Sequence, residues 1–228
     1  MLLSLDWLSS LVDLDGLDTR EIADLLTLAT AEVEQIEEVH LKAEGIVAEV
    51  VYDGGTLVLS DGSTTLPGSA PDALAVGARV VVLRDGKLAA PLTGGPGPWL
   101  LGADVAVGQD VEDLVPASDT LFELDNKSLT HRPDLWGHYG FARELAAIFE
   151  RELVDLEEID LSAYADLPSL PVQIESPDCF YYSAIAMRCA AADPSPLLVQ
   201  RRLAVLDQRS LGLSPVISLS HAVRTLPV

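Results

Sequence analysis

The sequence is poor in several residue types, and each shortage excludes a class of protein. Its 228 residues include two cysteines, Cys179 and Cys189, too few for a framework of several disulfide bonds. Apolar runs stay well below the roughly 18 residues that a membrane helix needs. The first residues, MLLSLDWLSS, lack the basic segment that begins a signal peptide. We therefore expect a cytoplasmic protein with two reduced thiols and no membrane contact.

Basic residues are scarce as well, with 14 lysines and arginines against 36 acidic residues and a formal net charge of −22. The imbalance is confined to residues 1–160, which hold 31 acidic and 9 basic side chains, whereas residues 161–228 hold five of each. Such a surface repels phosphate, so we expect nucleic acid to bind weakly if at all. A solvated acidic exterior that favours solubility accounts for this charge, and docking to a basic partner is the alternative.

Signatures of catalysis and of metal binding are missing from the sequence. It contains no phosphate-binding G-x-x-x-x-G-K loop, no dinucleotide fingerprint and no G-x-S-x-G nucleophile turn. His131 and His138 lie seven residues apart, whereas two metal ligands on one helix usually lie three or four apart. We therefore predict no catalytic and no metal-binding residue. A hydrolase built from the C-terminal part of the chain around His221 is a weaker alternative.

The chain begins with two helical patterns and a strand. Apolar residues at helical spacing predict a short helix over residues 5–12, with Trp7 on or beside its apolar side. Asp18 precedes a second apolar stripe and predicts the N-cap of a helix that runs to residue 29. The β-branched content of residues 32–39 favours a strand.

Residues 43–92 have a different pattern, dominated by short β-branched runs. The run GIVAEVVY is followed by two Asp-Gly pairs at residues 61–62 and 85–86, each flanked by apolar residues. Asp-Gly between apolar runs is a strong signal for a β-hairpin. We therefore predict a five-stranded antiparallel barrel or a small sandwich, which ends at the Gly/Pro-rich residues 93–98.

Residues 124–149, LDNKSLTHRPDLWGHYGFARELAAIF, predict a strand end followed by a helix over residues 135–149. Pro133 suits the first helical turn, and Asp134 suits the positive end of the helix dipole. Gly137 and Gly140 lower helix propensity by roughly 1 kcal/mol each. We interpret both glycines as places where another part of the backbone packs closely.

The entrance to this predicted helix is the candidate binding site, for an anion or for a partner protein. Asn126, Lys127, His131 and Arg132 gather there, and a helix N-terminus offers free backbone N–H groups. In the alternative interpretation Asn126 and Thr130 cap a turn and Arg132 pairs with a neighbouring carboxylate.

The last part of the sequence follows an acidic connector with prolines at 168 and 171. It predicts strands at PVQIE (171–175) and YYSAIAMRCAA (181–191), a helix that begins near Ser195, and a further strand at VISLSHAV (216–223). No capping or turn element closes this portion, so we expect it to be incomplete.

Several of these segments together resemble the N-terminal part of the β subunit of bacterial phenylalanine–tRNA ligase. SLDWLSSLV, EIADLLTLATAEVEQIEEV and the Asp-Gly hairpins follow one another in the order of that family. SLTHRPDLWGHYGFARELAAIF resembles its T-P-N-R-x-D…G-x-A-R-E-x-A-A-L segment, and residues 194–200 resemble the P-S-P-L-x-x-Q entry to a helix of its editing domain. Residues 218–224, SLSHAVR, depart from the D-x-T-N-Y-V-M pattern of the family.

The resemblance implies an α+β fold with three parts. These are a discontinuous N-terminal domain at 1–42 plus 116–160, an inserted OB-like barrel with linker at 43–115, and the incomplete start of an editing-type domain at 168–228. It also implies that the chain is a fragment or a truncated relative of the class II synthetase that charges tRNA(Phe) with phenylalanine. The chain would then have a structural or assembly role in that enzyme. We expect the α subunit as partner, weak tRNA contact, and ATP and Mg bound only in the full ligase. A free-standing acidic protein-binding module is the alternative function.

Overall fold

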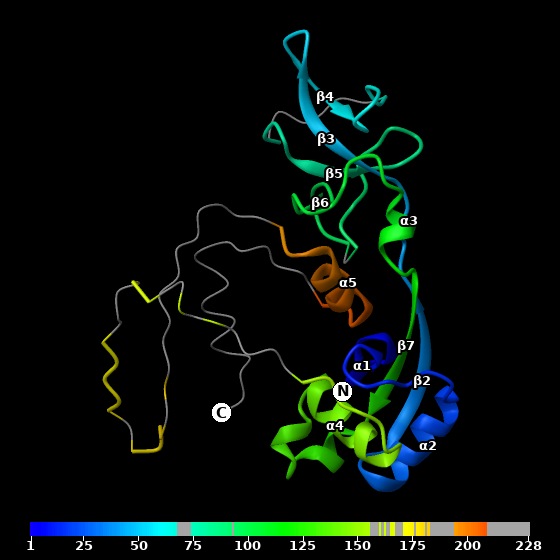
Figure 1. The fold of residues 1–228 in the computed structure, drawn as a ribbon, viewed down its shortest axis with the longest axis vertical. Coiled ribbons are helices and arrows are strands. Elements are labelled where there is room, and N and C mark those ends of the chain that lie inside the picture. The colour runs from blue at the N-terminus through cyan, green and yellow to red at the C-terminus, as the bar shows by residue number, and fades with distance from the viewer. Residues whose placement is uncertain are drawn as a thin grey trace.

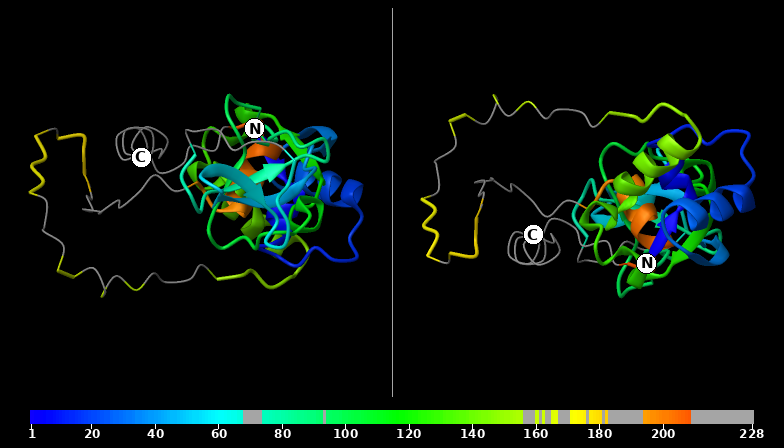
Figure 2. Two further views of the ribbon diagram at one scale, coloured as in Figure 1. Left: turned by 90° about the horizontal axis from the view of Figure 1, so that it is seen from above. Right: turned by 90° about the horizontal axis from the view of Figure 1, so that it is seen from below.

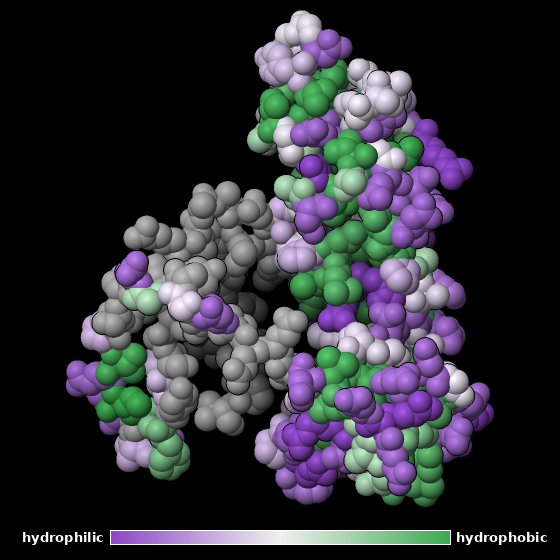
Figure 3. Space-filling view, viewed as in Figure 1, coloured by the Kyte–Doolittle hydropathy of each residue, from purple (hydrophilic) through white to green (hydrophobic). Residues whose placement is uncertain are grey.

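A computed structural model describes residues 1–67, 74–92, 94–155, 160, 162, 165–166, 171–175, 177–180, 182 and 194–208. The described residues form two antiparallel sheets accompanied by helices, so the predicted α+β class is confirmed. The two sheets lie at opposite ends of an elongated body (Figure 1 and Figure 3), and short segments of the chain connect them. No helix in the described ranges has the length and apolar character needed to cross a membrane.

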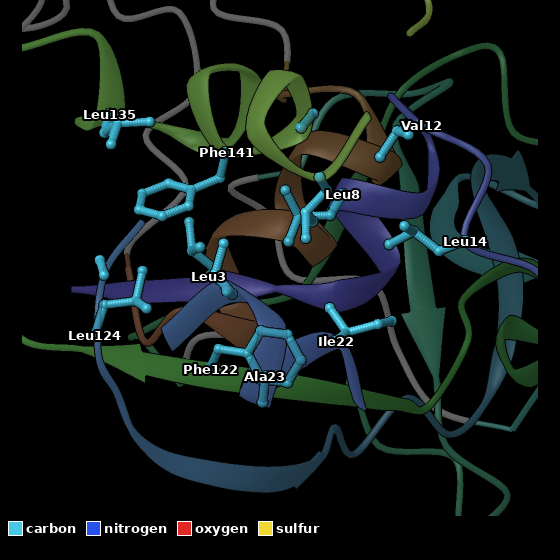
Figure 4. Packing of buried hydrophobic residues seen from close by; sticks show 14 of the residues in the cluster. Leu3, Leu8, Val12, Leu14, Ile22, Ala23, Phe122, Leu124, Leu135 and Phe141 are labelled. Carbon is cyan, nitrogen blue, oxygen red and sulfur yellow. The ribbon is translucent and has the colours of Figure 1, made fainter. Parts of the chain in front are cut away.

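The first lobe consists of a three-stranded sheet of order β1-β7-β2 and three helices. Its elements are β1 (Leu2–Ser4), α1 (Leu5–Ser9), α2 (Thr19–Ala29), β2 (Val33–His40), β7 (Ser118–Leu124) and α4 (His138–Ile148). One hydrophobic core joins segments from both ends of this list, including Leu3, Leu8, Ile22, Phe122 and Phe141, all at most 1% exposed (Figure 4). Residues far apart in sequence therefore share one core.

Two helices of the first lobe, α1 and α2, begin where the sequence predicts. The carboxylate of Asp18 accepts hydrogen bonds from the backbone N–H groups of Arg20 and Glu21, as an N-cap should. The hydroxyl of Ser4 caps α1 by accepting from Trp7 N–H at 3.0 Å. The strand prediction for residues 32–39 is confirmed by β2.

The second lobe is a four-stranded sheet of order β4-β3-β5-β6. Its elements are β3 (Ile46–Asp53), β4 (Thr56–Ser60), β5 (Arg79–Val82), β6 (Leu100–Leu101) and the short helix α3 (Val111–Leu114). Val47 and Val81 belong to one apolar cluster, and Ala48, Val50 and Val80 belong to another. Because alternate residues of a strand face opposite sides, both faces of this sheet are covered, which explains the continuous β-branched runs. In the described residues β4 and β6 form the sheet edges, so a closed barrel is not confirmed.

Both Asp-Gly pairs form turns, but the strands that follow them are shorter than predicted. The carboxylate of Asp61 accepts from the N–H groups of Ser63 and Thr64, and beyond each turn the pairing is a single bridge, Ser60 with Thr65 and Val82 with Leu88. The long hairpin of this lobe is β3 with β4, turned at Gly54 and Gly55 with φ of 55° and 90°. Two successive glycines with positive φ supply that turn, and with Asp53 before them they form a further Asp-Gly pair at a hairpin turn.

The predicted helix over residues 135–149 begins later than expected. Residues Asn126–Leu129 and Pro133–Leu135 form two 3₁₀ turns, η1 and η2, and α4 starts only at His138. The extended backbone of Gly137, with φ of 179°, separates η2 from α4. Pro133 and Asp134 therefore open a 3₁₀ turn and do not lie at the start of the long helix.

The two glycines of this segment differ in their surroundings. A Cβ on Gly140 would collide with the backbone carbonyl oxygen of Asp134, whereas nothing lies within 4 Å of a Cβ on Gly137. The prediction of close packing is confirmed for Gly140 and wrong for Gly137.

The last described helix, α5 (Leu197–Val205), forms where the sequence predicts a helix. It lies between the two lobes, below β6 and above α1 in Figure 1, and the views from above and below in Figure 2 keep it against the body. Residues 171–175 have no strand structure, so the strand prediction at PVQIE is wrong. The predicted strand at 216–223 and most of that at 181–191 lie outside the described residues. The predicted domain boundaries stay a prediction.

Candidate functional site

Helix α5 buries two polar residues together with Ala204 and Val205 and exposes two large apolar ones, which is unusual for a surface helix. Gln200 and Arg201 are 7% and 2% exposed, whereas Leu198 and Val199 are 54% and 43% exposed. Buried polar groups are stable only where partners satisfy them. The buried face of α5 therefore marks a docking site, and its three consecutive residues Gln200, Arg201 and Arg202 carry most of the polar contacts.

Gln200 connects α5 to the second lobe. Its Oε1 accepts from the indole N–H of Trp99 at 2.9 Å, and its Nε2 donates to the carbonyl oxygen of Leu100 at 3.1 Å. Nε2 also lies 2.7 Å from the carbonyl oxygen of Ser195 at the start of the helix. Trp99 is 1% exposed, so without this amide its indole N–H would be buried with one partner fewer. The side chain of Gln200 thus fixes the beginning of α5 against β6.

Arg201 connects α5 to the first lobe and to the chain segment that enters β7. Its Nη1 lies 2.7 Å from a carboxylate oxygen of Asp6 and 3.6 Å from one of Asp119. Its Nε donates to the carbonyl oxygen of Pro116 at 3.0 Å, and its Nη2 donates to that of Ser118 at 3.1 Å. A planar guanidinium suits such a divergent set of acceptors, which a lysine ammonium could not reach together.

Asp119 is the buried carboxylate that faces Arg201 in this contact. Its side chain is 1% exposed, and its carboxylate accepts from the hydroxyl of Ser4 at 2.7 Å and from the backbone N–H of Asp6 at 3.1 Å. Asp119 therefore orders the start of α1 and at the same time presents negative charge to Arg201. Burying either charge alone would be costly, so each requires the other.

Arg202 is the third docking residue and contacts α1. Its Nη2 donates to the hydroxyl of Ser10 at 2.7 Å, and its Cζ lies 4.8 Å from the ring centroid of Trp7. This distance is within the range of a cation–π interaction. Burial lowers the pKa of Arg202 from its usual value, and its Nε makes no hydrogen bond to the described residues. Its contribution therefore rests on the Trp7 ring and on Ser10.

His138 completes the surroundings of Trp7. The two rings stack with centroids 4.0 Å apart and an angle of 18° between their planes. The imidazole Nε2 accepts from the backbone N–H of Ser4 at 2.9 Å, which requires the neutral, deprotonated nitrogen. Burial, and next the charge of Arg202, lower the pKa of His138 from 6.5 to about 4. The histidine acts as a neutral hydrogen-bond acceptor in the described structure.

This depressed pKa makes stability depend on pH. Above pH 6.5 the imidazole of His138 is neutral in both the folded and the unfolded protein. As the pH falls from 6.5 to about 4, His138 takes up a proton in the unfolded protein first. We therefore expect the free energy of unfolding to fall in this window, by at most about 3 kcal/mol from this residue. Chemical denaturation of the wild type and of His138→Gln between pH 4 and 8 measures it. The difference between the two proteins should shrink toward pH 4, and a constant difference would contradict the assignment.

The residues predicted to form a binding site at the helix entrance lie around η1 and η2. Lys127 and His131 are exposed, and the carboxylate of Asp125 caps η1 by accepting from Lys127 N–H at 2.9 Å. The hydroxyl of Thr130 donates to the carbonyl oxygen of Lys127 at 3.2 Å. Asn126 is part of the η1 turn. Since α4 starts only at His138, its N-terminus does not lie beside these four residues in sequence.

Arg132 is engaged with two carboxylates. Its Nε and Nη2 donate to Asp134 at 3.0 and 2.8 Å, and Nη2 also donates to Glu144 at 2.7 Å. These bonds raise the pKa of Arg132 and lower that of Asp134. Glu144 in turn accepts from the hydroxyl of Thr30 at the end of α2. The alternative interpretation of Arg132, pairing with a neighbouring carboxylate, describes this arrangement, in which it ties η2 to α4.

The docking contacts were not predicted from the sequence. The predicted helix that begins near Ser195 contains Arg201 and Arg202, but no role was predicted for Gln200, Trp99 or Asp119. One signal was available. Arg201 lies four residues after Leu197 and three before Ala204, so it shares a face with apolar residues. An arginine in a stripe of buried residues predicts a buried carboxylate opposite it.

The chain is similar to several curated proteins. It is 34% identical over 216 residues, 86% of its length, to the phenylalanine–tRNA ligase β subunit of Solibacter usitatus. It is 28% identical over 260 aligned residues, 93% of its length, to that of Halalkalibacterium halodurans. To that of Leptospira interrogans it is 40% identical over 116 residues. No protein-family model matches the chain.

These similarities cover only part of each relative. The chain spans 26% of the Solibacter usitatus protein and 32% of the Halalkalibacterium halodurans protein. Nearly all residues of this chain are therefore aligned, but they match only a portion of each β subunit. The predicted resemblance is confirmed: the sequence corresponds to the N-terminal part of a phenylalanine–tRNA ligase β subunit.

Proposed function

We propose that this chain is a structural and assembly part of a phenylalanine–tRNA ligase, the enzyme that charges tRNA(Phe) with phenylalanine using ATP. The observation that carries the proposal is the similarity of 86% of the chain to a β subunit. The polar docking of α5 supports it, because such a site serves to hold domains together. On this proposal the chain is not catalytic alone, and a free-standing acidic binding module is not favoured.

The partner and the cofactors follow from the same proposal. The α subunit of the ligase is the protein with which this part assembles in the cytoplasm, and ATP and Mg bind elsewhere in the full enzyme. We propose that the second lobe is the OB-like insert of the family, and its antiparallel four-stranded sheet supports this assignment. The proposed contact residues remain Asn126, Lys127, His131 and Arg132, which lie between β7 and α4 of the first lobe.

A chimera tests the proposed function directly. The aligned portion of the Solibacter usitatus β subunit is replaced by this chain and coexpressed with the cognate α subunit, with the unmodified β subunit as control. We expect the chimera to copurify with the α subunit and to charge tRNA(Phe), whereas the chain alone shows no charging and no deacylation of mischarged tRNA. Activity of the purified chain alone, lost on a single substitution within it, would overturn the proposal.

We also predict weak tRNA affinity for the chain alone. Between residues 43 and 110 it has only three basic residues, Arg79, Arg84 and Lys87, and phosphate contacts depend on such side chains. The guanidinium of Arg79 donates to the carbonyl oxygens of Ala103 and Val105, and Lys87 pairs with Asp85 at 2.7 Å. Titration of labelled tRNA at 150 mM salt should therefore show no tighter binding than the non-specific range, a Kd of about 10⁻⁴ to 10⁻⁶ M. Nanomolar binding with a steep salt dependence would contradict this.

A further inference from the structure

The two lobes are joined by few elements. Two chain segments cross between them in the described residues, 41–45 before β3 and 115–117 before β7. They run beside each other, and the N–H of Leu41 donates to the carbonyl oxygen of Ala117 at 2.7 Å. Ala43 and Val115 in these segments are buried in the core of the second lobe, so only residues 41–42 and 116–117 lie between that core and the sheet of the first lobe.

No apolar core spans the two lobes in the described part of the chain. One cluster of buried residues belongs to the first lobe, and two other clusters, which share no member with it, belong to the second. Buried apolar contact is what normally makes an interface between domains rigid. The angle between the lobes therefore needs another support.

Helix α5 touches both lobes and supplies that support. Its Leu197 packs against the cluster of Trp99 in the second lobe, and Gln200 bonds Trp99 and Leu100 there. One and two residues later, Arg201 and Arg202 bond Asp6 and Ser10 in the first lobe, both at 2.7 Å. Hydrogen bonds are directional, and a satisfied buried polar network is rigid, so these bonds from adjacent residues of one helix constrain its orientation toward both lobes.

We propose that α5 is a strut that sets the angle between the two lobes, and that the lobes hinge about residues 41–42 and 116–117 when α5 leaves its docking site. The inference does not depend on the enzymatic role proposed above. Its consequence is conformational coupling: any event that displaces α5 from its docking site changes the position of the second lobe relative to the first.

Pulsed electron paramagnetic resonance measures this angle as a distance between two spin labels. Leu28 in the first lobe and Tyr52 in the second are 82% and 67% exposed, so both accept a labelled cysteine after Cys179 and Cys189 are replaced by serine. Leu203→Pro breaks α5, because proline inside a helix removes a backbone hydrogen bond and clashes with the preceding turn. We expect the distance distribution between the labels to become at least twice as wide. Leu198→Ala, on the exposed face of the same helix, should leave it unchanged.

A second label pair within the first lobe, at residues 9 and 28, shows whether that lobe stays folded. If this pair stays narrow and the interlobe distribution is also as narrow as in the wild type, the strut proposal is wrong. If the pair within the lobe broadens in Leu203→Pro, the variant Gln200→Ala decides. Among the described residues, the side chain of Gln200 bonds Trp99 and Leu100 of the second lobe and Ser195 just before α5, and none of the first lobe. A broadened interlobe distribution in Gln200→Ala supports the proposal, and an unchanged one overturns it.

Discussion

Replacing Arg201 by methionine should lower the free energy of unfolding by about 3 to 5 kcal/mol, which is typical when one partner of a buried ion pair is removed. Methionine fills a similar volume, so the cost comes from charge and hydrogen bonds and not from a cavity. Asp119, with a side chain that is 1% exposed, would keep its negative charge but lose the cation beside it. The carbonyl oxygens of Pro116 and Ser118 would each lose a donor. Urea denaturation followed by tryptophan fluorescence measures the change.

Arg151→Met is the matched control for this substitution. Arg151 pairs with Asp13 at 3.2 Å, but the two side chains are 37% and 58% exposed. Exposed pairs contribute roughly 0 to 1 kcal/mol, so the control should change stability little. Adding Asp119→Asn to Arg201→Met should recover part of the loss, because it removes the uncompensated charge. Equal costs for the Arg201 and Arg151 variants would show that the guanidinium of Arg201 is not held in a buried ion pair.

Gly140→Ala should destabilise the first lobe by about 2 to 4 kcal/mol, as overpacking against a fixed neighbour does. The atom in the way is the carbonyl oxygen of Asp134, a backbone atom that cannot turn aside as a side chain could. Relief of the collision requires η2 and α4 to separate, which would disturb buried Leu135 and Phe141. The gain in helix propensity from alanine, about 1 kcal/mol, is smaller than this cost. Thermal unfolding followed by circular dichroism measures the net change.

Gly137→Ala is the matched control, three residues earlier in the same segment. With φ of 179° and nothing within 4 Å of the added Cβ, the site accepts alanine without strain. The expected change is within about 0.5 kcal/mol, as for surface substitutions without a special role. If both variants lost stability equally, the close approach of η2 to α4 would not explain the Gly140 result.

Local signals were sufficient to predict most elements of the first lobe. Asp18 marks the start of α2 because an acceptor side chain at an N-cap is read directly from sequence. The helix over 135–149 was predicted to start too early because residues 133–135 have helical chemistry but form a 3₁₀ turn. The feature that separates them from α4 is the extended conformation of Gly137, which depends on the packing of η2 and not on residue preference. Tertiary context therefore decided this boundary.

The docking site depended on contacts that no local pattern contains. Trp99, Asp119 and Gln200 come from three separate parts of the chain, and their meeting is fixed by the placement of α5 between the lobes. The interpretation of residues 126–132 as a contact site followed from crowding of polar residues in sequence. In the structure the most polar of them, Arg132, is satisfied within the lobe by Asp134 and Glu144. Polar residues are therefore most crowded in sequence at residues 126–132, whereas polar side chains from distant parts of the chain meet at the docking site of α5.

The discontinuous sheet of the first lobe has a consequence for the order of folding during synthesis. Leu2, Leu3 and Ser4 pair with Glu123, Phe122 and Leu121, so β1 leaves the ribosome more than a hundred residues before its partner strand. The strands of the second lobe are contiguous in sequence and can pair first. Because loop closure over such a separation is slow relative to local pairing, β1 waits unpaired while the second lobe folds. A chaperone that binds exposed apolar segments would therefore find β1 and α1 accessible until β7 has been made.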